Sequence, residues 1–182
     1  MKQPDFQRLF FDHFGGVPRK VAYSVRQDSN RRHDMVFLSS LIHDARFRES
    51  DVALHGKRLT IPINRDCWEL GFVKNTTGSE LYVADSRLTI SPVRSLEWRV
   101  SQGFKMDKTE FWIGSVWLAE DTIGDERDLV IDGHNWRCVV TLETEDITIR
   151  LSDLETPFLY STRKRRKANN GLNGTARKLA AR

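Results

Sequence analysis

The sequence predicts an α+β protein in which two N-terminal helices pack on a mainly antiparallel, strongly curved β-sheet, arranged as a sandwich or a partial barrel. Apolar residues before residue 46 recur at helical spacing, and those after it alternate with polar residues in short runs. Clusters of Gly, Asn and Pro separate these runs. The chain of 182 residues is long enough for a sizeable core, so residues 1–162 are expected to form a single domain.

The two helices are expected over residues 5–14 and 35–45. In the second helix, Asp34 is the expected N-cap, because its carboxylate can accept hydrogen bonds from free backbone N–H groups. The apolar face of the first helix comprises Phe6, Leu9, Phe10 and Phe14. The apolar stripe of the second comprises Met35, Leu38, Ile42 and Ala45.

The clearest strand signal is a hairpin over residues 52–63. Apolar and polar residues alternate on both sides of a turn at His55-Gly56-Lys57. Pro62 has no N–H group to donate to a β-ladder, which places its strand at a sheet edge or at a bulge.

A further strand is expected to end at Pro92. The apolar positions before it change parity between Val83 and Leu88, which predicts a bulge or a tight turn near Asp85-Ser86. Residues 111–118 are apolar on both faces, as in a central strand. A second hairpin over 129–142 and a strand over 147–151 complete the expected sheet.

Composition indicates a cytoplasmic protein without membrane contact. The chain has no apolar run of about 18 residues. Its first residues lack the apolar region and the cleavage site of a signal peptide. In a reducing compartment Cys67 and Cys138 are expected to be free thiols, and the absence of a Cys-x-x-Cys pair argues against a zinc knuckle.

The positive charge is concentrated in the last 20 residues. Residues 163–182 hold eight of the 29 Lys and Arg residues and no acid, so the remaining 21 basic residues face 25 acidic ones. This segment is predicted to be a disordered basic tail. It could bind nucleic acid non-specifically as a polyanion through its densest run, which comprises Arg163, Lys164, Arg165, Arg166 and Lys167.

One wedge of the second helix carries Ser39, Ser40, His43 and Asp44. Residues three or four apart on a helix can touch, and a Ser–His pair with a carboxylate is the raw material of acyl transfer. However, the Gly-x-Ser-x-Gly turn that exposes such a nucleophile is missing. The wedge therefore fits the polar side of an amphipathic helix better than a catalytic site.

An alternative hypothesis is a hydrolase-type enzyme with a site around His43, Asp44, Asp66 and Cys67. Cys67 could be its nucleophile, although the adjacent Trp68 favours a buried, structural cysteine. The five histidines show none of the spacings of metal sites, and no phosphate-binding or dinucleotide-binding loop is present. We therefore expect neither a metal nor a cofactor, and no catalytic residue is assigned.

The segment Leu41-Ile42-His43-Asp44-Ala45-Arg46, followed by an alternating strand pair, resembles the opening of small bacterial β-rich domains of unknown function. Some of these domains are proposed to act as immunity proteins against secreted toxins. The resemblance covers residues 35–69 and implies a binding protein whose partner is another protein. Together with the missing catalytic motifs, it leads us to expect a non-enzymatic cytosolic binding protein of unknown specificity and oligomeric state.

Overall fold

The computed structural model describes residues 19–26, 31–70, 72–75, 78–104, 110–123 and 126–160. The predicted helix over residues 5–14 and the basic tail from residue 163 lie outside these ranges.

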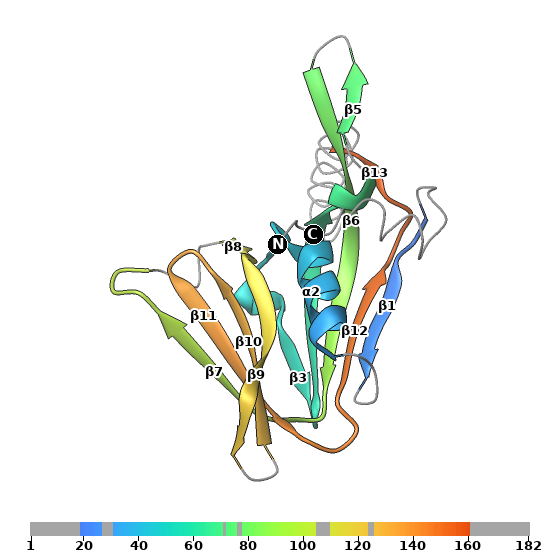
Figure 1. Ribbon diagram of the computed structural model, residues 1–182. Coiled ribbons are helices and arrows are strands. Elements are labelled where there is room, and N and C mark those ends of the chain that lie inside the picture. Colours follow the sequence, from blue (N-terminus) through green and yellow to red (C-terminus); the bar gives the residue numbers. More distant parts are fainter. Residues whose placement is uncertain are drawn as a thin grey trace, which may run out of the picture.

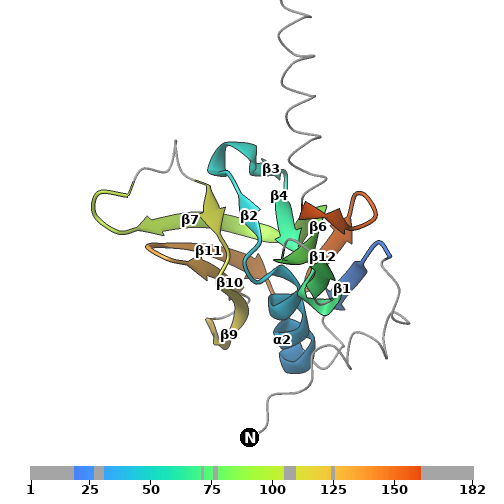
Figure 2. The same cartoon turned by 90° about the horizontal axis from the view of Figure 1, so that it is seen from above.

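The described part of the chain is mainly β, with one α-helix, α2 (Arg31–Ile42), and two antiparallel sheets. The predicted antiparallel pairing is confirmed. The predicted α+β class, with two N-terminal helices packed on a sheet, is wrong. The helix covers neither sheet as a layer, because it lies between the two sheets and contacts β9 of one and β1 of the other (Figures 1 and 2).

The strand order of each sheet is given from one edge strand to the other. The larger sheet has the order β1 (Ala22–Arg26), β12 (Thr148–Asp153), β6 (Gly78–Ser91), β4 (Arg58–Asp66), β2 (Arg46–Phe47) and β8 (Phe111–Trp112). Short strands extend it: β3 (Ala53–His55) pairs with β4, while β5 (Phe72–Asn75) and β13 (Phe158–Leu159) pair with β6. The smaller sheet has the order β7 (Val93–Val100), β11 (Trp136–Glu143), β10 (Glu126–Gly133) and β9 (Ser115–Ile123). Two 3₁₀ turns are η1 (Glu49–Asp51) and η2 (Trp68–Leu70).

The chain passes between the sheets four times, between β6 and β7, β7 and β8, β8 and β9, and β11 and β12, and the two sheets form the V shape seen in Figure 1. Three of these passages are short corners. Strand β6 ends as predicted at Pro92, and β7 continues into the smaller sheet. Residues 144–147 form the matching corner between β11 and β12, and the Glu143 N–H donates to the Pro92 carbonyl at 3.1 Å. The third corner is Ile113-Gly114. The predicted central strand over 111–118 is therefore wrong, since the corner divides it into edge strands of two different sheets.

Aromatic side chains fill the space between the sheets. Phe111 and Trp136 meet edge to face with ring centroids 5.1 Å apart, and Phe47 stacks on Phe111 at 5.2 Å. Each large apolar side chain buried in this way contributes about 1.5–3 kcal/mol relative to an exposed one. From α2, the fully buried Leu38, Leu41 and Ile42 join the same core.

Strand pairing confirms both predicted hairpins, with β3 on β4 and β10 on β11. Pro62 lies between the stretches of β4 that pair with β3 and with β2, so its missing N–H interrupts no ladder on that side. The predicted bulge or tight turn near Asp85-Ser86 is wrong, because β6 keeps one register along β4 and β12. The small Ser86 simply takes a buried position on the core face.

Helix α2 begins earlier than predicted and is held at its end by the third corner. It starts at Arg31, so Asp34 lies within it and accepts a hydrogen bond from the Tyr23 hydroxyl at 2.8 Å instead of capping. After the helix, Asp44 has a left-handed φ of 62° and donates its N–H to the Ile113 carbonyl at 2.8 Å. The Ile113 N–H donates a hydrogen bond to the Ala45 carbonyl at 2.8 Å. These bonds fix the helix next to the start of β9.

Candidate binding groove between α2 and β9

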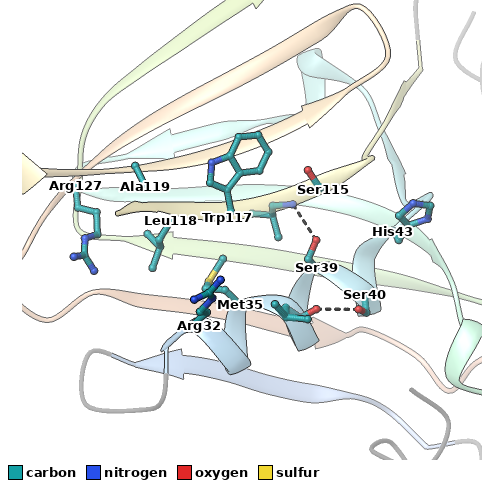
Figure 3. Close-up of a pocket in the computed structure, with 12 residues that line it drawn as sticks. Arg32, Met35, Ser39, Ser40, His43, Ser115, Trp117, Leu118, Ala119 and Arg127 are labelled. Atoms are coloured by element: carbon teal, nitrogen blue, oxygen red, sulfur yellow. Dashed lines mark hydrogen bonds between the residues drawn. The ribbon is translucent and has the colours of Figure 1, made fainter. Parts of the chain in front are cut away.

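A groove of about 770 Å³ runs between helix α2 and strand β9 (Figure 3). The helix contributes one continuous stripe, at spacings of three and four residues: Arg32, Met35, Val36, Ser39, Ser40 and His43. The strand contributes residues 115–119, five in succession, and β10 contributes Arg127. Since successive side chains of a strand point to opposite faces, a cavity lined by five in succession faces the edge of the strand.

The free edge of β9 faces the helix. Strand β9 is the last in its sheet, and in the described part of the chain its only strand partner is β10. The Val116 N–H points away from β10, because it donates a hydrogen bond to the Ser39 hydroxyl on α2 at 3.1 Å. Outward groups recur every second residue, so the N–H and carbonyl of Leu118 also point away from β10 and toward the groove.

The groove is apolar along its middle and basic at one end. Val36 is 55% exposed, although it lies beside the buried Met35 and Val116. Arg32 and Arg127 lie at the end near Leu118, away from His43. No Asp or Glu is among the described residues that line the groove. The Arg127 Nε is buried and has no hydrogen-bond partner among the described residues.

Three residues of the polar wedge predicted on α2, Ser39, Ser40 and His43, line the groove, whereas Asp44 does not. His43 is brought close to Asp44, with Nδ1 3.0 Å from Oδ2, and its side chain is 54% exposed. The two hydroxyl groups have other partners: Ser39 accepts from Val116, and Ser40 donates to the Val36 carbonyl at 2.9 Å. The Ser–His contact that acyl transfer needs is thus not formed among the described residues.

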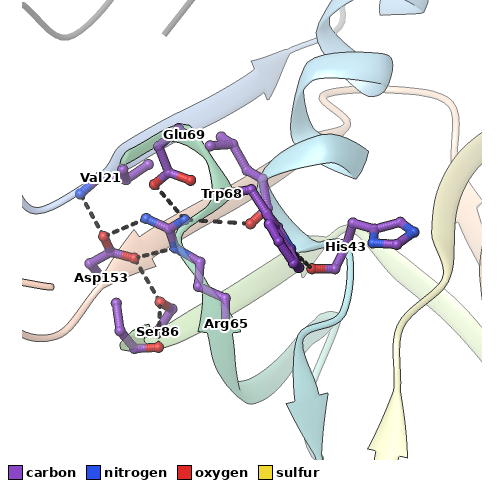
Figure 4. Close-up of polar contacts among 9 residues, drawn as sticks. Val21, His43, Arg65, Trp68, Glu69, Ser86 and Asp153 are labelled. Carbon is purple, nitrogen blue, oxygen red and sulfur yellow. Dashed lines mark hydrogen bonds and ion pairs between the residues drawn. The ribbon is translucent and has the colours of Figure 1, made fainter. Parts of the chain in front are cut away.

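The other two candidate catalytic residues point elsewhere. Asp66 pairs with Arg46, with 2.7 Å between Oδ1 and Nη2. Cys67 is fully buried, and burial raises the pKa of its thiol, which opposes formation of a nucleophilic thiolate. The Trp68 indole donates to the His43 carbonyl at 3.3 Å (Figure 4). The structure therefore brings together His43 and Asp44 but gives Asp66 and Cys67 different surroundings, and the enzyme hypothesis stays a prediction.

Both cysteines, Cys67 and Cys138, are free and buried, as predicted for thiols. Within the described ranges, no group of three or more His, Cys, Asp or Glu side chains is arranged to hold a metal ion. The same residues include no helix that is long and apolar enough to cross a membrane.

A second polar cluster, which we did not predict, lies inside the larger sheet. Arg65 is fully buried and donates to Asp153 through Nε and Nη2, both at 2.9 Å, and to Glu69 through Nη1 at 2.7 Å. Ser86 donates to Asp153 at 2.6 Å. We call these four residues the Arg65 cluster (Figure 4). Three of them continue apolar alternations, Arg65 after Ile63, Ser86 before Leu88 and Asp153 after Leu151. These three residues could have been predicted from the sequence, because each is a polar residue at a position where the alternation places a core residue.

The Arg65 cluster links strands of the larger sheet to one another and to the end of α2. It connects β4, β6, β12 and η2, and Asp153 also accepts the Val21 N–H at 2.8 Å. Arg65 Nη1 reaches the Leu41 carbonyl near the end of α2 at 3.5 Å. The cluster is packed within the protein and does not line the groove. We therefore assign it a structural role.

Glu69 makes the stability of the fold depend on pH. Burial raises the pKa of its carboxyl above the ordinary value of 4.5, against the opposing charge of Arg65. The folded protein then holds this proton more tightly than the unfolded chain. The contribution of Glu69 is complete below pH 4.5 and is lost as the pH rises through the folded-state pKa.

Glu69→Gln should remove this dependence, because an amide remains neutral at every pH. We expect the free energy of unfolding of the native protein, measured in urea relative to that of Glu69→Gln, to fall as the pH rises above 4.5. The exposed Glu97 is the control, and its Gln variant should show no such fall relative to the native protein. If the difference in free energy of unfolding between the native protein and Glu69→Gln stayed constant as the pH rises above 4.5, Glu69 would be ionised in both the folded and the unfolded state.

Fold and groove together define a class: a two-sheet antiparallel β protein in which a single described helix borders an open strand edge. No protein-family model matches the chain, and no curated protein or solved structure is significantly similar to it.

Proposed function

We propose that the protein is a non-enzymatic binding protein whose α2–β9 groove takes up a segment of another protein. The observation that carries this proposal is the lining of the groove, where one stripe of helix faces the edge of a strand along five successive residues. An elongated, mainly apolar groove of about 770 Å³ suits a length of polypeptide. Free buried thiols at Cys67 and Cys138 support a cytoplasmic location.

Two expectations from the sequence agree with this proposal. Catalytic motifs are missing, and residues 35–69 resemble domains of which some are proposed as immunity proteins, which act by binding a toxin. An immunity-like role would place a toxin segment in the groove. Polyanion binding by Arg163–Lys167 stays a separate prediction, because these residues lie outside the described part of the chain.

The groove can be tested as an apolar binding site with the dye anilinonaphthalene sulfonate. Val36→Glu places a charge at the exposed centre of the groove, and Glu is a better helix former than Val, so the fold should be retained. We expect dye affinity, measured by fluorescence titration, to fall about tenfold, which corresponds to about 1.4 kcal/mol.

Leu54→Glu is the matched control, because Leu54 is 44% exposed on β3 and does not line the groove. This variant should bind the dye like the native protein. If Val36→Glu also binds the dye with native affinity, the groove is not the apolar binding site and the proposal fails.

A further inference from the structure

We infer that the partner segment binds as an added β-strand on the edge of β9, and that it carries a carboxylate which Arg32 and Arg127 receive. This inference rests on the proposed function and names the chemistry of the occupant: an extended, acidic peptide segment. Two features of the groove carry it, namely its open backbone groups and its charge.

The backbone of β9 offers hydrogen bonds that the described residues leave unused. Ser39 occupies the Val116 N–H, so the open part of the edge begins at the Val116 carbonyl and continues through the N–H and carbonyl of Leu118. An extended chain placed beside an edge strand pairs with such groups and gains affinity from main-chain hydrogen bonds. Its side chains then alternate, with every second one directed toward the apolar wall formed by Met35 and Val36.

Helix α2 restricts which chains can pair with the edge of β9. Edge strands in soluble proteins are commonly shielded against pairing with a further sheet. Here α2 contacts β9 and Ser39 accepts the Val116 N–H, so only the part of the edge beyond that N–H remains open to pairing. A second copy of this protein, joined β9 to β9, would also bring Arg32 and Arg127 of both copies together, which their like charges oppose.

The two arginines at one end of the groove indicate which charge the bound segment carries there. Arg32 and Arg127 come from different elements and lie at the same end of the groove. The acids on either side of Arg127 in the sequence have other partners, since Glu126 pairs with Arg94 and Asp128 accepts a hydrogen bond from the Thr141 hydroxyl. Guanidinium groups bind carboxylates through paired, charge-assisted hydrogen bonds. An Asp or Glu side chain, or a terminal carboxylate, at the corresponding end of the added strand fits this arrangement.

The experiment compares two acetylated hexapeptides of alternating Val and Thr, one ending in Asp and the other in Asn, both with an amidated C-terminus. Amide resonances of the isotope-labelled, full-length protein report where each peptide binds. We expect the Asp peptide to shift the Leu118 amide and to slow its hydrogen exchange, which a merely apolar contact would not do. Arg127→Gln should weaken binding of the Asp peptide about tenfold and leave binding of the Asn peptide unchanged.

Arg99→Gln is the matched control, since Arg99 belongs to the same sheet, pairs with Glu97 and does not line the groove. It should not affect either peptide. If Arg127→Gln does not fold, Arg32→Gln on the exposed helix surface provides the same comparison.

Three results would overturn the inference. The Asp and Asn peptides could bind equally well to the native protein, or an Asp peptide methylated at alternate backbone nitrogens could bind as well as the parent. In either case the groove binds peptide but not as an acidic added strand, and the proposed function stands. If neither peptide shifts a groove amide, the inference also fails, and the dye titration with Val36→Glu separately decides whether the groove binds apolar ligands.

Discussion

Replacing Arg65 by Met is expected to lower the free energy of unfolding by about 3–5 kcal/mol. The native guanidinium is fully buried and donates to Asp153 twice and to Glu69 once. Methionine has a comparable length but leaves both carboxylates buried without their cationic partner. Because the cluster connects β4, β6, β12 and η2, its loss should weaken the larger sheet as a unit. Urea unfolding followed by circular dichroism measures the effect.

Two variants make the interpretation specific. Arg99→Met removes an arginine that also pairs with a carboxylate, Glu97, but both side chains are 58% exposed, so the variant should unfold at nearly the same urea concentration as the native protein. Arg65→Lys keeps the charge but loses the forked geometry that binds Asp153 through two nitrogens, and its stability should lie between those of Arg65→Met and the native protein. A loss below about 1 kcal/mol for Arg65→Met would contradict the structural role of the cluster.

Gly133→Ala is expected to cost about 3 kcal/mol or more, at the upper end of the range for overpacking. A Cβ atom at this position would lie 2.0 Å from the Trp112 carbonyl oxygen and 2.5 Å from the Trp136 Nε1. The oxygen belongs to the backbone of β8, so a change of side-chain rotamer cannot relieve the contact. The methyl group would therefore push β8 of the larger sheet away from the end of β10 in the smaller sheet. Thermal unfolding of the purified variant measures the loss.

Gly114→Ala provides the matched control at the same corner. Its Cβ would have its nearest contact at 3.5 Å, to the Asp132 carbonyl oxygen, which is an ordinary van der Waals distance. We expect a change within about 1 kcal/mol. Equal losses for the two alanine variants would show that the sheets do not approach each other at Gly133 as the structure indicates.

The local elements could be predicted from the sequence to a large extent. Alternation on both sides of Gly56 predicted the first hairpin, and an apolar run before Gly133 with alternation after it predicted the second. The spacing of Met35, Leu38 and Ile42 predicted α2. These patterns are informative because neighbouring residues alone determine which side chains share a face. The first residue of α2 was missed, since Asp34 bonds to Tyr23, a partner from another element, instead of capping the helix.

The candidate site was predictable only in part. His43, Ser39 and Ser40 were recognised as one wedge of the helix, and they do line the groove. The wall opposite them could not be anticipated, because residues 111–118 read as a continuous apolar strand. Only the corner at Ile113-Gly114 turns β9 into an edge and directs it toward the helix.

The sequence by itself determined the hairpins, the apolar face of α2 and the strand end at Pro92, since each depends on side chains a few residues apart. Tertiary structure alone decided that the strands divide into two sheets with α2 between them, and that Arg65 meets Asp153, 88 positions later in the chain. The physical reason is that a buried charge needs an opposite charge beside it in space. Which distant residue provides that charge depends on how the strands are ordered.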